Sequence, residues 1–180
     1  TWLLLKELEK SGTVSFKDFY IRRSLRIFPA FYVYWSLVVA ASLLHHRSIP
    51  IGQALSSFLY LGNYYQAVLG DPNTALSHTW SLGIEEQFYA LWPLCFLLLA
   101  RDLKRMIGTL AIGIVGIWLY RSLLAGLGVS QNYFYFAFDT RADQLMVGCL
   151  LAVVLKSKYR TAFMSRICSS PKAPFVTVTG

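Results

Sequence analysis

A histidine, a serine and two adjacent carboxylates stand at the start of a long apolar run. They are His78, Ser81, Glu85 and Glu86, and the apolar side chains that follow continue to Ala100. A charge carried into hydrocarbon loses its hydration. Ionisable groups at the start of such a run therefore usually indicate a catalytic or transport site. An imidazole near a carboxylate is suited to proton transfer in general acid–base catalysis.

The spacing of this motif predicts that its polar side chains share one side of a helix. If the helix begins near residue 77, one stripe contains His78, Ser81, Glu85 and Trp92, close to the membrane surface. The structural alternative is that the carboxylates only favour the positive end of a helix N-terminus, while the histidine lies at the membrane interface. Two adjacent carboxylates are more than a cap needs, and both interpretations stay open.

Three arginines within five positions form a second candidate site. On a helix Arg22 and Arg26 share one face at i and i+4, with Arg23 three positions before Arg26. Guanidinium groups carry a planar fork of donors that matches phosphate, so their convergence predicts a phosphate-binding site. The alternative is a topology anchor that binds anionic lipid headgroups, which needs only positive charge.

A third polar group precedes the last apolar run. Arg141 lies between Asp139 and Asp143, and we expect it to neutralise its acidic neighbours, which lowers the free energy of a charge at the membrane. Structural pairing is the simpler explanation of this group. The adjacent histidines at 45 and 46 point about 100° apart on a helix, and we interpret them as loop residues.

The composition places these groups in a membrane protein. Of the 180 residues 56% are hydrophobic and only 14% are charged, against about 25% charged residues in soluble chains. A net charge of +8 would suit nucleic acid, but the positive residues cluster between apolar runs and form no single basic stripe, so no nucleic-acid partner is expected. The scattered cysteines have no spacing typical of a metal site, and no metal is expected.

Four apolar runs approach the roughly 17–25 residues that cross a bilayer as a helix. We therefore predict an all-α, multi-pass transmembrane bundle, with partial spans at residues 1–5 and from Ala173 onward. The predicted full spans are Phe28 to Leu44, Glu86 to Ala100, Met106 to Leu124 and Leu145 to Leu155.

The basic residues predict which segments face the cytoplasm. If Ile51 to Leu69 does not cross, fourteen of the seventeen basic residues fall on one side, as the positive-inside rule requires. We interpret that segment as re-entrant or interfacial, which leaves Leu44 to Glu85 as one long extracytoplasmic loop. The cytoplasmic segments are then Lys6–Arg26, Arg101–Arg105 and Lys156–Lys172.

Three blocks together resemble the acyltransferase 3 family of multi-pass membrane O-acyltransferases. They occur in the family's order, and the resemblance covers nearly the whole chain: FYIRRSLRIFP (19–29), HTWSLGIEEQFYALWP (78–93) and RADQLMVG (141–148). The resemblance implies transfer of an acyl group, often acetyl, from a cytoplasmic acyl-CoA-type donor to a hydroxyl of a cell-envelope carbohydrate or a related acceptor. Acyl-CoA would be a co-substrate rather than a bound cofactor, and the partners would be membrane lipids and a glycan.

The same resemblance implies roles for the candidate residues. Arg22, Arg23 and Arg26 would lie near the phosphates of the donor. The catalytic region and its support would comprise His78, Ser81, Glu85, Glu86, Arg141 and Asp143.

One part of the family pattern is absent from the sequence. The family's first helix carries a basic residue followed eleven positions later by the histidine held to be the catalytic base, and no histidine here has that neighbour. We therefore expect residues 1–180 to be part of a single acyltransferase domain truncated at both ends, with its main base before Thr1 and no activity alone. The expected location is a bacterial inner or plasma membrane.

Two other classes of protein fit the same residues. In a polytopic transporter or channel subunit, the charges at positions 22, 26, 85 and 143 would line an ion or substrate path. In a membrane anchor they would have a structural role only.

Overall fold

The computed structural model describes residues 1–156, and within that range the chain forms helices and no strand. A 3₁₀ turn, η1 (Ser77–Thr79), leads directly into α5. The α-helices are α1 (Trp2–Ser11), α2 (Phe16–Leu44), α3 (Ile51–Phe58), α4 (Gly62–Leu69), α5 (Trp80–Leu99), α6 (Leu103–Gly126), α7 (Gln131–Phe136) and α8 (Ala142–Lys156).

Three helical segments of the described chain are long and apolar enough to cross a membrane. They are α2, η1 with α5, and α6. The fourth predicted span forms α8, whose 15 described residues give about 22 Å of helix, less than the roughly 30 Å hydrocarbon core. The all-α membrane fold is confirmed, with three full spans rather than four in the described part. The predicted partial span after Ala173 lies outside the described residues.

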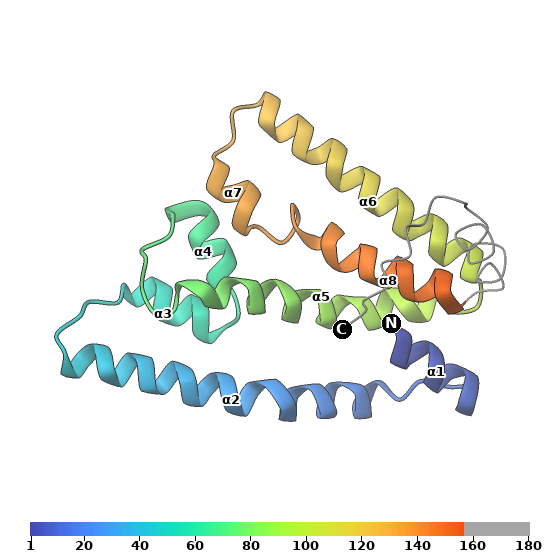
Figure 1. Cartoon of the computed structure of the whole chain (residues 1–180), viewed down its shortest axis with the longest axis horizontal. Helices are drawn as coiled ribbons and strands as arrows, with labels where there is room; N and C mark the ends of the chain where they lie inside the picture. Colours follow the sequence, from blue (N-terminus) through green and yellow to red (C-terminus); the bar gives the residue numbers. More distant parts are fainter. Residues whose placement is uncertain (157–180) are drawn as a thin grey trace, which may run out of the picture.

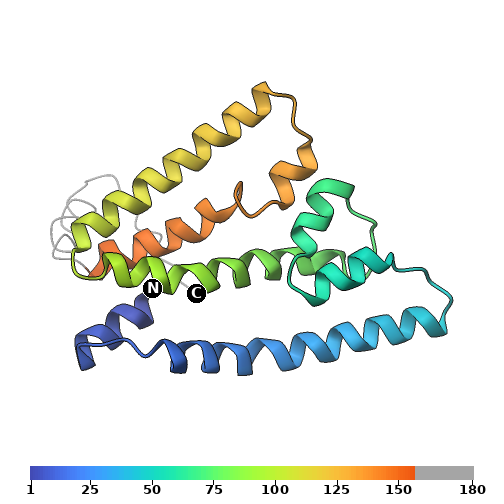
Figure 2. The same ribbon diagram turned by 180° about the vertical axis from the view of Figure 1, so that it is seen from behind.

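The described parts of the basic segments lie at one end of the molecule. Figure 1 shows that α1, the start of α2, the α5–α6 connection and the end of α8 all lie at this end, and Figure 2 shows the same from behind. An ion pair of 2.6 Å between Lys156 Nζ and Glu9 joins α8 to α1 there. We call this the basic end and the opposite end, which contains α3, α4 and α7, the loop end.

The ambiguous segment 51–69 folds into α3 and α4 at the loop end. Each helix has eight residues, about 12 Å, so neither reaches across a bilayer. The end of α2 and the start of α5 lie at this same end (Figure 1). This arrangement agrees with the prediction that the segment does not cross.

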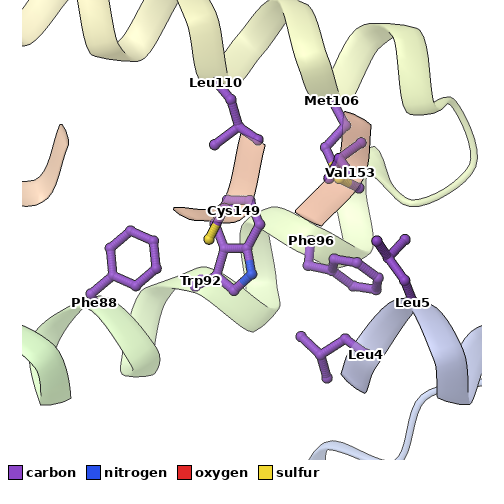
Figure 3. Close-up of a cluster of buried hydrophobic side chains, with 9 residues drawn as sticks. All are labelled: Leu4, Leu5, Phe88, Trp92, Phe96, Met106, Leu110, Cys149 and Val153. Carbon is purple, nitrogen blue, oxygen red and sulfur yellow. The ribbon is translucent and has the colours of Figure 1, made fainter. Parts of the chain in front are cut away.

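The apolar core lies where α1, α5, α6 and α8 meet, as Figure 3 shows. Phe96 of α5, Met106 of α6 and Val153 of α8 are fully buried in it. The rings of Phe88 and Trp92 stack with their centroids 5.6 Å apart. This cluster fixes α5, and α5 carries Ser81, Glu85 and Glu86 of the predicted site.

Helix α2 is joined to the rest of the molecule by long side chains that donate hydrogen bonds. Ser15 caps its N-terminus by accepting a hydrogen bond from the Asp18 N–H, as N-cap serines do. Further along, Tyr20 donates to the carbonyl of Ala90 at 3.0 Å, and the Trp35 indole donates to the carbonyl of Ala54 at 3.1 Å. Cavities between α2 and the facing elements hold the candidate site.

Candidate active site

A partly buried ion pair joins α2 to α5. Arg23 Nη2 lies 2.9 Å from Glu86 Oε1, and the two side chains are 20% and 14% exposed. The guanidinium carbon also lies 3.2 Å from the centre of the Tyr89 ring, a cation–π arrangement. Arg23 is therefore committed to α5, and its charge is compensated before any ligand binds.

The three arginines do not converge on one site as predicted. Arg22 is exposed and lies 3.5 Å from Glu7 of α1, while Arg26 is exposed and lines a different cavity from Arg23. Successive helical residues point about 100° apart, so Arg22 and Arg23 reach different partners. The arrangement leaves Arg22 and Arg26 open to the phosphates of a ligand, whereas Nη2 of Arg23 is already bonded to Glu86.

Arg26 lines a cavity of about 370 Å³ together with His78 and Ser81. We call this the middle cavity. Tyr34 of α2 also lines it, packs edge-on against the His78 ring with centroids 5.4 Å apart, and donates a hydrogen bond of 2.5 Å to the Ala75 carbonyl. The structure thus brings together an arginine, an imidazole and a hydroxyl from two segments about fifty residues apart.

The predicted stripe on α5 is present, but its members have different surroundings. The helix begins through η1 at Ser77, as expected. His78, Ser81 and Glu85 are exposed, and only the first two line the middle cavity. Trp92 is buried in the core, because α1 and α8 cover α5 at that level.

A buried polar network holds the turn that carries His78. Gln53 of α3 donates to Ser77 Oγ at 3.3 Å and accepts from Thr74 at 2.8 Å, while Gln66 of α4 donates to the Ser77 carbonyl at 2.6 Å. Thr79 donates to the Leu76 carbonyl at 2.7 Å. These hydrogen bonds fix η1 against α3 and α4, and among the polar atoms of Gln66 only Oε1 is buried without a partner in the described part of the chain.

Tyr60, between α3 and α4, is held in a left-handed conformation. Its φ is +58°, which is uncommon for a residue other than glycine. Its carbonyl accepts a hydrogen bond of 2.9 Å from Gln87 Nε2, which also donates to Asn63 Oδ1 at 2.9 Å. A Cβ atom at Gly83 would lie 2.8 Å from that carbonyl oxygen, so glycine is required where α5 passes the turn.

A second cavity, of about 300 Å³, is lined by Tyr60, Arg23, Glu86 and Tyr89. We call it the inner cavity. Neither the Tyr60 hydroxyl nor the Nε–H of Arg23 has a hydrogen-bond partner among residues 1–156. Burial, with smaller contributions from Tyr32 and Glu86, raises the pKa of Tyr60, so its hydroxyl stays protonated. Two buried donors at one cavity are suited to an oxygen acceptor on a ligand.

The expected pairing of Arg141 with its acidic neighbours is wrong. Arg141 donates to the Tyr135 carbonyl at 3.0 Å and lies over the ring of the same residue. Asp143 pairs instead with Arg121 of α6 at 3.0 Å, and Asp139 accepts from Tyr133 at 3.1 Å. Residues two positions apart at a helix start point to different sides, which explains why the sequence neighbours do not meet.

The Arg121–Asp143 pair joins α6 to α8 inside the apolar bundle. Asp143 is 6% exposed, and Asp143 Oδ2 also accepts a hydrogen bond of 3.0 Å from the Trp118 indole. Arg121, Tyr60 and Gln87 were not among the predicted site residues. The position of Arg121 within a predicted span could have indicated a buried acidic partner, because a lone charge in a span needs one.

Three apolar helical segments, with charges paired between helices, define a multi-pass membrane protein. The cavities beside α2 are mainly apolar but contain a few polar side chains. Residues 2–170 match the family model described as an acyltransferase domain. The chain therefore belongs to this acyltransferase family, which confirms the resemblance drawn from the three blocks.

Several named proteins are similar in sequence to the chain. The chain is 35% identical over 170 residues to the peptidoglycan O-acetyltransferase OatA of Listeria monocytogenes, covering 86% of the chain and 27% of that protein. It is 30% identical over 175 residues to the putative peptidoglycan O-acetyltransferase YrhL of Bacillus subtilis, covering 88% of the chain and 27% of that protein. A putative O-acetyltransferase of Staphylococcus aureus is 32% identical over 170 residues, covering 84% and 27%.

The matched region thus spans about a quarter of the length of these relatives. No solved structure matches the chain.

Proposed function

We propose that the chain is part of a membrane O-acyltransferase that transfers an acyl group to a hydroxyl of a cell-wall glycan. The relatives named as peptidoglycan O-acetyltransferases favour acetyl as the group and peptidoglycan as the acceptor. We propose that the protein lies in a bacterial plasma membrane, where its outer side would be accessible to such an acceptor. The observation that carries the proposal is the pair of cavities beside α2, which hold Arg26, His78 and Ser81 in one and two unpartnered donors in the other.

The donor is proposed to be an acyl-CoA-type thioester that approaches from the basic end. Most of the described basic residues gather there (Figure 1), and the exposed Arg22 lies among them. Positive charge attracts the phosphates of such a donor, and guanidinium groups bind them by paired hydrogen bonds. Arg23 is excluded from this role because Glu86 already occupies it.

We propose a reaction that uses the inner and middle cavities. The acceptor hydroxyl loses its proton to a base, its oxygen attacks the thioester carbonyl carbon, the carbon–sulfur bond breaks, and the proton passes to the leaving thiolate. Negative charge develops on the carbonyl oxygen, and the Tyr60 hydroxyl and Arg23 Nε–H are donors available to it. None of the three histidines of the sequence follows a basic residue by eleven positions, so we leave the base unassigned and propose that His78 and Ser81 hold the acceptor.

Two charge pairs of the described spans give no support to a transport path, whereas Arg26 and Glu85 are exposed and belong to neither pair. Arg23 is paired with Glu86, and Arg121 with Asp143, so both pairs are compensated within the protein. A row of open charged sites would be expected along a substrate path.

Acyl transfer by the full-length protein in membranes tests the proposal. Removal of one oxyanion donor typically lowers kcat by about a hundredfold or more, so Tyr60→Phe is expected to lower kcat strongly. His78→Ala is expected to raise KM for the acceptor. Tyr65→Phe is the matched control, because it removes a hydroxyl from the adjacent helix α4 but not from either cavity.

Equal activity of Tyr60→Phe, His78→Ala and the control at equal membrane insertion would contradict the assigned roles. Movement of a solute across the membrane without any acylated product would favour a transporter.

A further inference from the structure

A third cavity lies at the loop end, outside the site described above. It has a volume of about 700 Å³ and is formed by the last turns of α2 and the two loops that follow α2 and α4. We call it the outer cavity. Its polar lining consists of Ser42, His45, Arg47, Ser48, Asn73 and Thr74. Both loops lie at the end of the molecule opposite α1 (Figure 2).

We propose that the outer cavity docks a carboxylate-bearing glycan, the acceptor of the transfer reaction. The inference rests on the proposed function and adds the acceptor's binding site and its chemical class. It also gives a role to the segment 45–47, which the sequence analysis interpreted as loop residues.

The lining residues select the chemistry of the ligand. Hydroxyl and amide side chains are suited to the hydroxyls of a sugar, and Arg47 supplies a positive charge with a fork of donors that matches a carboxylate. No carboxylate occurs among the lining residues of the described chain. The volume falls within the roughly 300–1,000 Å³ of small-molecule sites.

The loops that form the cavity have a fixed backbone. His46 and Asn73 adopt φ values of +51° and +53°, left-handed conformations that a surrounding structure must stabilise in residues other than glycine. The Arg47 N–H donates to the Ser42 carbonyl at 2.9 Å, which fixes the start of one loop. These contacts hold Arg47 and Asn73 on facing segments of the wall.

The outer cavity is linked to the turn that carries His78. Thr74 lines the cavity and is bonded both to Gln53 at 2.8 Å and, through its N–H, to Ser77 Oγ at 2.8 Å. Ser77 immediately precedes His78. A ligand that contacts Thr74 therefore contacts the polar network that holds the turn containing His78.

Helix α2 lines both the outer and the middle cavity. Arg26, Ala30 and Tyr34 line the middle cavity, and Val38 and Ser42 line the outer one. Each step of four residues turns about 40° around the helix axis, so this row winds around α2 from one cavity to the other. The hydrogen bond from Tyr34 to the Ala75 carbonyl lies between them. A glycan bound in the outer cavity is thus positioned to extend a hydroxyl toward Arg26 and His78 once that bond opens.

Binding and kinetics of the full-length protein in nanodiscs of neutral lipid test the inference. The probes are a soluble disaccharide fragment of peptidoglycan with free carboxylates and the same fragment with its carboxylates amidated. We expect the acidic fragment to bind the wild type at least about tenfold more tightly than Arg47→Gln, the loss of one charge-assisted contact. Arg47→Lys should retain part of the affinity, because it keeps the charge without the fork.

Arg105→Gln is the matched control, since Arg105 is an exposed arginine at the basic end. The same variants are assayed for acyl transfer, where Arg47→Gln is expected to raise KM for the acceptor but not for the donor. Equal binding by wild type and Arg47→Gln, an equal loss in Arg105→Gln, or no preference for the acidic fragment would overturn the inference.

The two proposals fail in different ways. Acyl transfer that is insensitive to Arg47→Gln would remove the docking site and leave the proposed function standing. Arg47-dependent binding without acyl transfer would support the docking site and remove the proposed function.

Discussion

Substitution of Gly83 by alanine tests whether α5 must approach the Tyr60 turn closely. The new Cβ would lie 2.8 Å from the Tyr60 carbonyl oxygen and 3.2 Å from Asn63 Oδ1, whereas ordinary contacts begin at 3.4 Å. Overpacking of this kind costs about 1–3 kcal/mol. Displacing the turn also weakens the hydrogen bonds from Gln87, at about 1 kcal/mol. Alanine is favoured over glycine within a helix by about 1 kcal/mol, so the expected net loss of stability is about 2 kcal/mol.

The assay is thermal unfolding of the full-length protein in detergent, with acyl transfer measured on the same samples. Gly116→Ala is the matched control, because a Cβ at that position in α6 meets no atom within 4 Å. Only helix propensity acts there, and the control should be unchanged or slightly more stable. If both substitutions change the unfolding temperature equally, the close approach of α5 to Tyr60 does not exist.

Three further substitutions test contacts that hold the bundle together. Arg23→Ala and Glu86→Ala should each lower the free energy of unfolding strongly, since breaking a shielded pair leaves one charge uncompensated. The double variant should lose at least about 1.5 kcal/mol less than the sum of the two single losses. Additive losses in this double-mutant cycle would contradict the pairing. Asp143→Ala should cost about 3 kcal/mol by leaving the Arg121 guanidinium without its carboxylate, and adding Arg121→Gln should restore part of that loss in the same unfolding assay. Ser15→Ala should cost about 1 kcal/mol and Ser15→Asn almost nothing, because asparagine also caps a helix; equal losses measured by chemical unfolding would show that the cap is unimportant.

The membrane fold could be predicted from the sequence because its signals are local. Long apolar runs give the helices, and the distribution of basic residues gave the side on which 51–69 lies, in agreement with Figure 1. The span count differs at α8, because the predicted apolar run Leu145–Leu155 lies within a described helix of 15 residues, which is too short to cross a bilayer. Apolar runs reveal burial in lipid or protein but not the length of each helix.

The partners within the site depended on contacts that sequence spacing does not contain. Arg141 and Asp143 are close in sequence, yet the aspartate pairs with Arg121, twenty-two positions away. Glu86 was selected for its position in a motif, but its partner Arg23 comes from a helix more than sixty positions earlier. No sequence motif marks Tyr60. Its left-handed backbone conformation and the hydrogen bond from Gln87 of α5 to its carbonyl are visible only in the structure.

The donor side chains of α2 have a consequence for which positions of the chain tolerate substitution. Tyr20 and Trp35 donate to the main-chain carbonyls of Ala90 and Ala54, and every amino acid supplies such a carbonyl. Exchanging those alanines should leave the attachment of α2 intact, whereas exchanging the donors should not. In a library of variants scored for correct assembly, substitutions of Tyr20 and Trp35 should therefore be rare and substitutions of Ala54 and Ala90 common. Position 86 is the exception, because its acceptor is a side chain.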